Sequence, residues 1–231
     1  MIKQSKGRIF VADARVWIET DQHRSLGTLK GAPIGKLLML NEETLTGNAS
    51  VTYASEQDTD TIIVPVVGAI NVICSDGTTE LLEAGMAKMM RVPASASYEI
   101  ANPYEESLVK YVQIWLKASN ADFFNAETVD FDLENYQVNP LFFDPGPDDE
   151  YALSLVKLYG RQEELHLKKN NTNDLFVFVI QGALEVQYRL LHEGDGLALW
   201  DIDELEFEAL SNDAILLIIE AGLNPFSQVA G

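Results

Sequence analysis

Soft metal ligands are scarce in this sequence. It contains one cysteine, Cys74, and three histidines, His23, His166 and His192, which lie far apart along the chain. A single cysteine excludes an intramolecular disulfide bond and is typical of a reducing compartment, which favours a cytoplasmic location. A transition-metal site built from thiolates and imidazoles needs several such ligands to converge, so the sequence is poorly supplied for one.

Long apolar runs are also absent. The longest, at residues 62–67 and 214–219, have the length of a strand, whereas a membrane-spanning helix needs about 18 apolar residues. No apolar stretch follows the basic residues near the N-terminus, so we expect no signal peptide and no membrane partner.

Basic side chains are few, because 16 Lys and Arg residues stand against 36 Asp and Glu residues and give a formal net charge of −20. Nucleic acids and anionic membranes are polyanions that would repel such a chain, so we expect neither as its partner. The same charge favours a basic protein partner. Hydrophobic residues nevertheless form 47% of the 231 residues, which is enough to bury a core and excludes a disordered acidic tail.

Short runs rich in Val, Ile, Leu, Phe and Tyr alternate with turn residues, which predicts an all-β protein. An internal repeat organises these runs. Residues 60–72 (DTIIVPVVGAINV) align with residues 174–186 (DLFVFVIQGALEV), and each segment contains a glycine, Gly68 or Gly182, where a tight hairpin is expected. A Leu-Leu-x-x-Gly segment and two further strands follow in both copies. The repeat therefore predicts two similar β-barrels in tandem.

The repeat also suggests domain boundaries. We expect an N-terminal barrel at residues 1–117, a linker at 118–150 and a C-terminal barrel at 151–231. The linker contains Pro145 and Pro147 on either side of a glycine, a combination that cannot continue a strand or a helix.

The layout "strand, glycine, strand, Leu-x-x-Gly, strand", present twice, resembles that of a bicupin, which has two tandem cupin barrels of the jelly-roll type. Three segments resemble the pirin family in particular: residues 38–43 (LMLNEE), 112–116 (VQIWL) and 194–201 (GDGLALWD). The last of these is similar to the second barrel of bacterial pirin-like quercetinases. The resemblance runs from about residue 8 to residue 221 and implies a bicupin fold.

The resemblance also implies a metal, commonly iron, in the first barrel of a pirin. A His-x-His pair and a later His-x-Glu pair hold it, and counting from the glycines places these positions at Ala54, Glu56, Tyr98 and Ile100. Alanine and isoleucine cannot coordinate a metal, and Glu56 with Tyr98 would leave a transition metal under-coordinated. We therefore expect the first barrel to bind no metal cofactor and to contain no catalytic residue. We expect it to keep the shape of a cupin barrel.

Three functions stay open from the sequence. The favoured one is a non-catalytic small-molecule-binding or regulatory protein, in which the N-terminal barrel holds a small organic ligand. The second is a metal-dependent dioxygenase of the quercetin 2,3-dioxygenase type, which rests on the resemblance alone. The third is a protein-interaction cofactor, implied by the transcription-cofactor branch of pirins. The residues predicted to line the ligand site are Ala54, Glu56, Tyr98, Ile100 and Gln113.

The histidines have structural interpretations. His166 lies in a Gly-x5-His-x-Lys segment that is similar to a cupin ligand segment, but no second histidine joins it, so we favour a structural or surface histidine. His192 precedes a Glu-Gly-Asp-Gly turn, and His23 is predicted to be an exposed loop residue.

Acidic residues and the single cysteine are the remaining candidates for chemistry. Glu56, Asp58 and Asp60 alternate, which is compatible with a Ca²⁺ or Mg²⁺ site on one strand face or with a solvated acidic face or loop. We favour the second interpretation because no glycine or carbonyl ligands accompany the three acids. Cys74 ends an apolar strand without a catalytic partner nearby, which predicts a packing role.

Overall fold

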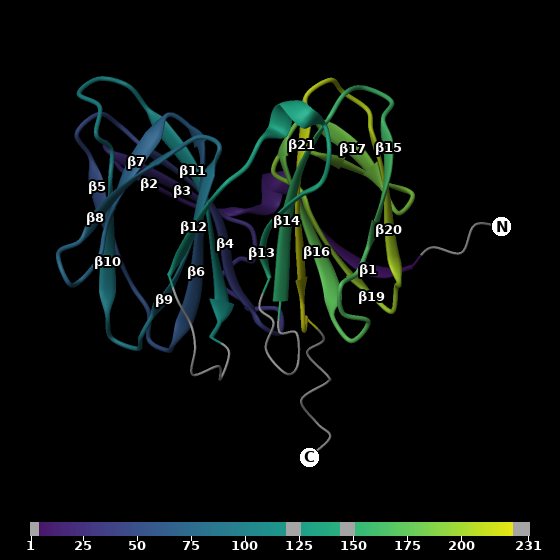
Figure 1. Ribbon diagram of the computed structural model, residues 1–231, viewed down its shortest axis with the longest axis horizontal. Coiled ribbons are helices and arrows are strands. Elements are labelled where there is room, and N and C mark those ends of the chain that lie inside the picture. Colours follow the sequence, from purple (N-terminus) through teal and green to yellow (C-terminus); the bar gives the residue numbers. More distant parts are fainter. Residues whose placement is uncertain (1–4, 119–125, 144–150, 224–231) are drawn as a thin grey trace, which may run out of the picture. The chain divides into compact units, whose positions relative to one another are not determined.

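Antiparallel strands form nearly all of the regular secondary structure of the computed structural model, which describes residues 5–118, 126–143 and 151–223 (Figure 1). The helical elements of this part of the chain are two short 3-10 turns, η1 (Ala12–Ala14) and η2 (Leu133–Asn135). None of its helices is long and apolar enough to cross a membrane. The chain divides into two units, Val16–Pro33 with Leu37–Phe131, and Met1–Arg15 with Ile34–Lys36 and Asp132–Gly231.

The N-terminal unit contains a seven-stranded and a four-stranded antiparallel sheet. Its strands are β2 (Val16–Glu19), β3 (His23–Gly27), β4 (Leu37–Leu45), β5 (Ser50–Ala54), β6 (Thr59–Val67), β7 (Ala69–Ile73), β8 (Thr79–Glu83), β9 (Met86–Val92), β10 (Ser97–Ala101), β11 (Val109–Lys117) and β12 (Glu127–Asp130). The large sheet has the order β12-β9-β6-β11-β4-β3-β2, and the small sheet has the order β5-β10-β7-β8. Apolar side chains of both sheets, such as Ile63 and Ile100, form one core between them.

The C-terminal unit has the same construction, with a six-stranded and a four-stranded sheet. Its strands are β1 (Lys6–Phe10), β13 (Asn139–Phe143), β14 (Tyr151–Leu158), β15 (Glu163–Leu167), β16 (Asp174–Gln181), β17 (Ala183–Val186), β18 (Arg189–His192), β19 (Gly196–Trp200), β20 (Glu204–Ala209) and β21 (Ala214–Ala221). The orders are β1-β19-β16-β21-β14-β13 and β15-β20-β17-β18. Its core is likewise built from both sheets, for example from Val177 and Leu184.

The internal repeat is confirmed strand by strand. The order β9-β6-β11-β4 of the N-terminal unit recurs as β19-β16-β21-β14, and β5-β10-β7-β8 recurs as β15-β20-β17-β18. Gly68 and Gly182 join equivalent hairpins with φ angles of 77° and 82°. This left-handed conformation carries a steric penalty for residues with a side chain, which explains the glycine in both copies.

The unit boundaries differ from the expected 1–117, 118–150 and 151–231. Strand β1, at the start of the chain, pairs with β19 of the C-terminal unit, and the expected linker contributes β12 to one unit and β13 to the other. In the sheet orders β1 and β12 occupy equivalent edge positions, as β13 and β3 occupy equivalent positions, but the paired strands come from different places along the chain, so the sequence repeat could not reveal them. The prolines of the expected linker, Pro145 and Pro147, lie outside the described residues.

Candidate functional site

The five residues predicted to line a ligand site lie on different faces of the N-terminal unit. Tyr98, Ile100 and Gln113 are buried in its interior, with exposed fractions of 3%, 0% and 0%. Ala54 is exposed at the end of β5, and Glu56 is exposed in the turn that follows. The structure therefore brings three of the five together and separates the other two from them.

A slip of one residue explains why Ala54 and Glu56 were misplaced. Side chains of a strand alternate between its two faces, so counting that is wrong by one residue selects the opposite face. On β5 the side chains of Val51 and Tyr53 pack against the core, whereas Thr52 and Ala54 are exposed. The prediction that Ala54 and Glu56 face the interior is wrong, and the inward residue is Tyr53. The alternation of Val51 and Tyr53 with small residues was a usable signal.

Aromatic and amide side chains meet where Tyr98 enters the interior. The ring of Tyr53 stacks on that of Tyr98, with centroids 5.4 Å apart. Trp115 donates a hydrogen bond from Nε1 to Tyr98 Oη at 3.0 Å, and Gln113 donates from Nε2 to the same oxygen. The Oη atoms of Tyr53 and Tyr111 are 2.7 Å apart and share a hydrogen bond. We call Tyr53, Tyr98, Tyr111, Gln113 and Trp115 the tyrosine cluster.

The three phenols of the tyrosine cluster resist ionisation. Burial is the main reason that the pKa values of Tyr53, Tyr98 and Tyr111 are raised above the ordinary value of 10.0, and the nearby Glu43 carboxylate acts in the same direction. Hydrogen bonds from Trp115 and Gln113 lower the pKa of Tyr98 without cancelling the effect of burial. All three phenols are therefore neutral at physiological pH.

A buried carboxylate lies next to the tyrosine cluster. Glu43 on β4 stands opposite Tyr111 on β11 and is 1% exposed. Its Oε2 lies 2.7 Å from His23 Nε2, and its Oε1 accepts hydrogen bonds from Ser25 Oγ at 2.9 Å and from Asn41 Nδ2 at 3.2 Å. The prediction that His23 is an exposed loop residue is wrong, because His23 begins β3 and its ring contacts this carboxylate.

The alternating acids at 56–60 do not share a strand face. Glu56 and Asp58 lie exposed between β5 and β6, whereas Asp60 is fully buried on β6. Both Asp60 oxygens accept hydrogen bonds from Arg91, Oδ1 from Nε at 2.8 Å and Oδ2 from Nη2 at 3.1 Å. Asp60 therefore forms an ion pair with Arg91. Among the described residues, no group of three or more His, Cys, Asp or Glu side chains could hold a metal ion.

His166 and Cys74 occupy structural positions, as predicted. His166 is 8% exposed, and its Nε2 lies 2.9 Å from Oε1 of the buried Glu220, whose other oxygen accepts a hydrogen bond from the backbone N–H of Lys169. Glu220 was not found from the sequence because it lies 54 residues from His166 along the chain. Cys74 packs against the core of the N-terminal unit.

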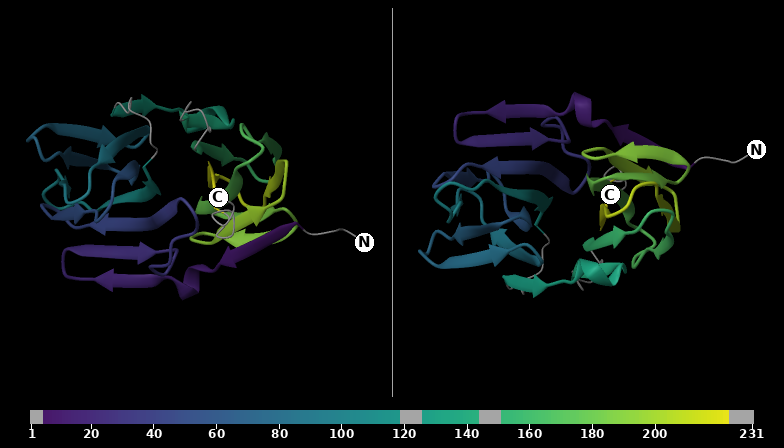
Figure 2. Two further views of the ribbon diagram at one scale, coloured as in Figure 1. Left: turned by 90° about the horizontal axis from the view of Figure 1, so that it is seen from below. Right: turned by 90° about the horizontal axis from the view of Figure 1, so that it is seen from above.

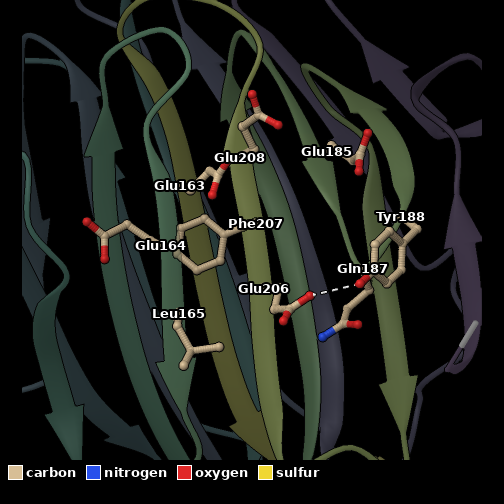
Figure 3. A pocket seen from close by; sticks show the side chains of 9 residues that line it. All are labelled: Glu163, Glu164, Leu165, Glu185, Gln187, Tyr188, Glu206, Phe207 and Glu208. Atoms are coloured by element: carbon tan, nitrogen blue, oxygen red, sulfur yellow. Dashed lines mark hydrogen bonds between the residues drawn. The ribbon is translucent and has the colours of Figure 1, made fainter. Parts of the chain in front are cut away.

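The small sheet of the C-terminal unit carries a groove of about 500 Å³ on its surface (Figure 3). Glu163 on β15, Glu208 on β20 and Glu185 on β17 stand directly opposite one another across three neighbouring strands. Like charges in such positions destabilise a sheet, and Arg161 offsets part of the repulsion through an ion pair of 2.9 Å with Glu208. Two further glutamates, Glu164 and Glu206, and the side chains of Leu165, Gln187, Tyr188 and Phe207 complete the lining.

Residues 150–220 match a family model described as the quercetinase C-terminal cupin domain, named Pirin_C_2. Along almost its whole length, the chain is similar in structure to YhhW from Escherichia coli, with a TM-score of 0.82, 16% sequence identity, and coverage of 95% of this chain and 99% of the other. The chain has a bicupin fold and resembles the pirin family. Both the predicted fold and the predicted family resemblance are confirmed. A search of curated proteins gives no match.

Two further solved structures share the fold of this pirin-like chain. Bacterial pirin YhhW from Escherichia coli in complex with nickel(II) has a TM-score of 0.79 at 16% identity and covers 94% of this chain and 99% of its own. Quercetin 2,3-dioxygenase from Acinetobacter baumannii has a TM-score of 0.70 at 14% identity, with coverage of 97% and 88%. At such low identities, these similarities establish the fold and leave the activity to be argued from the side chains.

Proposed function

We propose that this pirin-like chain is a non-catalytic protein that binds a small organic molecule or acts as a regulator, and that its N-terminal unit holds no transition metal. The tyrosine cluster carries this proposal. Tyr98 Oη accepts hydrogen bonds from Trp115 and Gln113, and Tyr53 Oη shares one with Tyr111 Oη, so both phenols are already engaged with protein groups. Burial favours the neutral form of both phenols. The indole N–H of Trp115 is a donor only, and Ile100 has no ligand atom. These side chains do not fit the metal that the pirin resemblance implies.

The first test measures metal content and oxygen consumption. We expect purified protein, dialysed against Fe²⁺, Mn²⁺ or Ni²⁺ and then against metal-free buffer, to retain far less than one equivalent of metal by plasma mass spectrometry. Oxygen uptake with quercetin should not exceed that of a metal-only control. One equivalent of bound metal that is lost in Tyr98→Phe, together with quercetin-dependent uptake, would contradict the proposal. That result would support the alternative, a dioxygenase of the quercetin 2,3-dioxygenase type.

The acidic groove favours a second candidate function, that of a protein-interaction cofactor with a basic partner. Glu163, Glu208 and Glu185 oppose one another across three strands, so a cationic segment would relieve a repulsion already present in the fold. Leu165 is half exposed beside them and offers an apolar contact. The Glu206 carboxylate raises the pKa of the Tyr188 phenol, which is consistent with a negative potential in the groove.

The second candidate predicts salt-dependent binding. We expect a nonalysine peptide to bind and to lose at least tenfold in affinity between 0.05 and 0.5 M NaCl, measured by fluorescence anisotropy, because salt screens exposed charges. Replacing Glu163, Glu185 and Glu208 by Gln should weaken binding. A control variant replaces the exposed Glu83, Glu105 and Glu106 by Gln and changes the net charge by the same amount. It should bind the peptide more tightly than the groove variant does. Equal losses in the two variants, or salt-insensitive binding, would refute a specific groove.

A further inference from the structure

In the N-terminal unit, the hairpin of β2 and β3 lies beside β4 at the end of the large sheet (Figure 2). Residues of these strands and of the turn after β3 line a separate pocket of about 200 Å³. Its walls are mostly apolar and include Ile18 on β2, Leu29 in the turn after β3, and Leu38 and Met39 on β4. The exposed Lys30 also lines it. Ser25 and Asn41 supply polar atoms. A small concave site with apolar walls and a few convergent polar groups is the usual form of a small-molecule site.

The buried Glu43 carboxylate fixes the orientation of the Asn41 amide. Asn41 Nδ2 donates to Ser25 Oγ and to Glu43 Oε1, both at 3.2 Å. A flipped amide would place its oxygen against the carboxylate, so the nitrogen must face Glu43 and Oδ1 must point the other way. Among the described residues, no hydrogen-bond donor reaches Asn41 Oδ1. The pocket therefore contains an oriented acceptor that no donor of the described residues engages.

Gly27 keeps this acceptor open. A Cβ atom at Gly27 would lie 3.2 Å from Asn41 Oδ1, and its next neighbour, the backbone oxygen of Val16, would be 3.6 Å away. The φ angle of Gly27 is not in the left-handed region, so backbone conformation does not require glycine at this position. Glycine inside a strand weakens the strand and often marks a place where a ligand approaches closely. Here the missing side chain leaves space directly over the amide oxygen.

We propose that this pocket binds a small neutral molecule with a compact apolar body and one hydroxyl group, which donates a hydrogen bond to Asn41 Oδ1. The apolar walls of the pocket contact the apolar body of this ligand. An ammonium group would lose its hydration for a single amide oxygen, because both Glu43 oxygens already have partners. A carboxylate would face Asn41 Oδ1 and the nearby Glu43, and the Lys30 ammonium stays exposed to solvent, so a neutral hydroxyl suits Asn41 Oδ1 better than either ion. The inference rests on the proposed small-molecule-binding function and names its site and its ligand class.

The experiment uses two probes with the same apolar body, benzyl alcohol and benzyl methyl ether, and the ether has no hydroxyl to donate. Backbone amide signals of the full chain are followed by heteronuclear NMR during titration. We expect benzyl alcohol to shift the signals of residues 25–31 and 38–41 saturably. We expect the ether to bind about tenfold more weakly, because it cannot form the hydrogen bond.

Substitutions at two glycines test whether binding of benzyl alcohol depends on this pocket or on a change elsewhere in the protein. Gly27→Ala should reduce the affinity for benzyl alcohol about tenfold, to that for the ether, because the new methyl group covers Asn41 Oδ1. Gly222→Ala is the matched control, since its Cβ would meet only the Lys36 side chain at 3.9 Å, and it should change neither affinity. Equal affinities of the two probes, shifts confined to other residues, or unchanged binding in Gly27→Ala would overturn the inference.

A second variant covers the case in which Gly27→Ala fails to fold. Ile18 is 63% exposed on β2, so Ile18→Trp is tolerated on the surface and narrows the pocket. Ile18→Trp should weaken the binding of both probes, and unchanged binding of both would overturn the inference. Metal content and oxygen uptake are measured on the same preparation. Failure of the proposed non-catalytic function would appear there as bound metal or quercetin turnover, whatever the two probes do.

Discussion

Raising the pH above 10 is expected to lower the free energy of unfolding steeply, by about 4 kcal/mol per pH unit through the tyrosine cluster alone. Burial raises the pKa of the Tyr53, Tyr98 and Tyr111 hydroxyls above the ordinary value of 10.0. Above pH 10 the unfolded chain releases three protons that the folded chain keeps. Folding then requires proton uptake, so stability falls as the pH rises, by about 1.4 kcal/mol per unit for each proton. Below pH 10 this contribution is fully present.

Urea unfolding at intervals between pH 9.5 and 11.5 measures this slope. Tyr98→Phe removes one of the three protons and should reduce the slope by about 1.4 kcal/mol per pH unit. Tyr104→Phe is the matched control in the same unit, because Tyr104 is 40% exposed and lies outside the cluster, and it should leave the slope unchanged. A slope that Tyr98→Phe does not alter would mean that the Tyr98 phenol is not a buried neutral group.

Asp60→Ala is expected to lower the free energy of unfolding by about 2–3 kcal/mol, because Arg91, whose side chain is only 21% exposed, loses its two charge-assisted hydrogen bonds to Asp60. Asp60 is fully buried and binds Arg91 through both oxygens, and the two residues stand opposite each other on β6 and β9. The loss is to be measured as a shift of the urea midpoint at pH 7, where carboxylates are ionised.

Asp58→Ala is the control for this substitution. Asp58 is exposed, and its carboxylate accepts one hydrogen bond, from the backbone N–H of Ala94, so we expect a loss of about 1 kcal/mol. The comparison also tests the rejected Ca²⁺ or Mg²⁺ site. If millimolar Ca²⁺ stabilised the wild-type chain and Asp60→Ala abolished that effect, Asp60 would be a cation ligand and the ion-pair interpretation would be wrong.

Much of the fold could be predicted because it depends on patterns that are local in the sequence. The hairpin glycines, Gly68 and Gly182, mark equivalent positions in two copies, and apolar runs of strand length surround them. Hydrophobic burial and a requirement for positive φ act on single strands and turns, so they are visible without tertiary structure. The edge strands β1, β12 and β13 were missed because nothing local distinguishes a strand added at an edge from a loop.

The candidate site was predicted only in part. Tyr98, Ile100 and Gln113 were placed in the interior, and the structure buries all three. Ala54 and Glu56 were assigned to the wrong face because strand register changes sides with every residue. The partnership of Glu43 with His23 and Ser25 could not be found from spacing, since it depends on the pairing of β3 with β4. The pairing of Asp60 with Arg91 likewise depends on β6 lying beside β9.

The sequence by itself determined the all-β character, the duplication and the pirin resemblance, because composition, periodicity and turn residues are properties of short segments. Tertiary structure alone decided which side chains meet. It stacked Tyr53 on Tyr98, oriented the Asn41 amide against Glu43, and left space above it at Gly27. These contacts join residues from different strands. Their geometry follows from register and sheet order, which the packing of the whole unit selects.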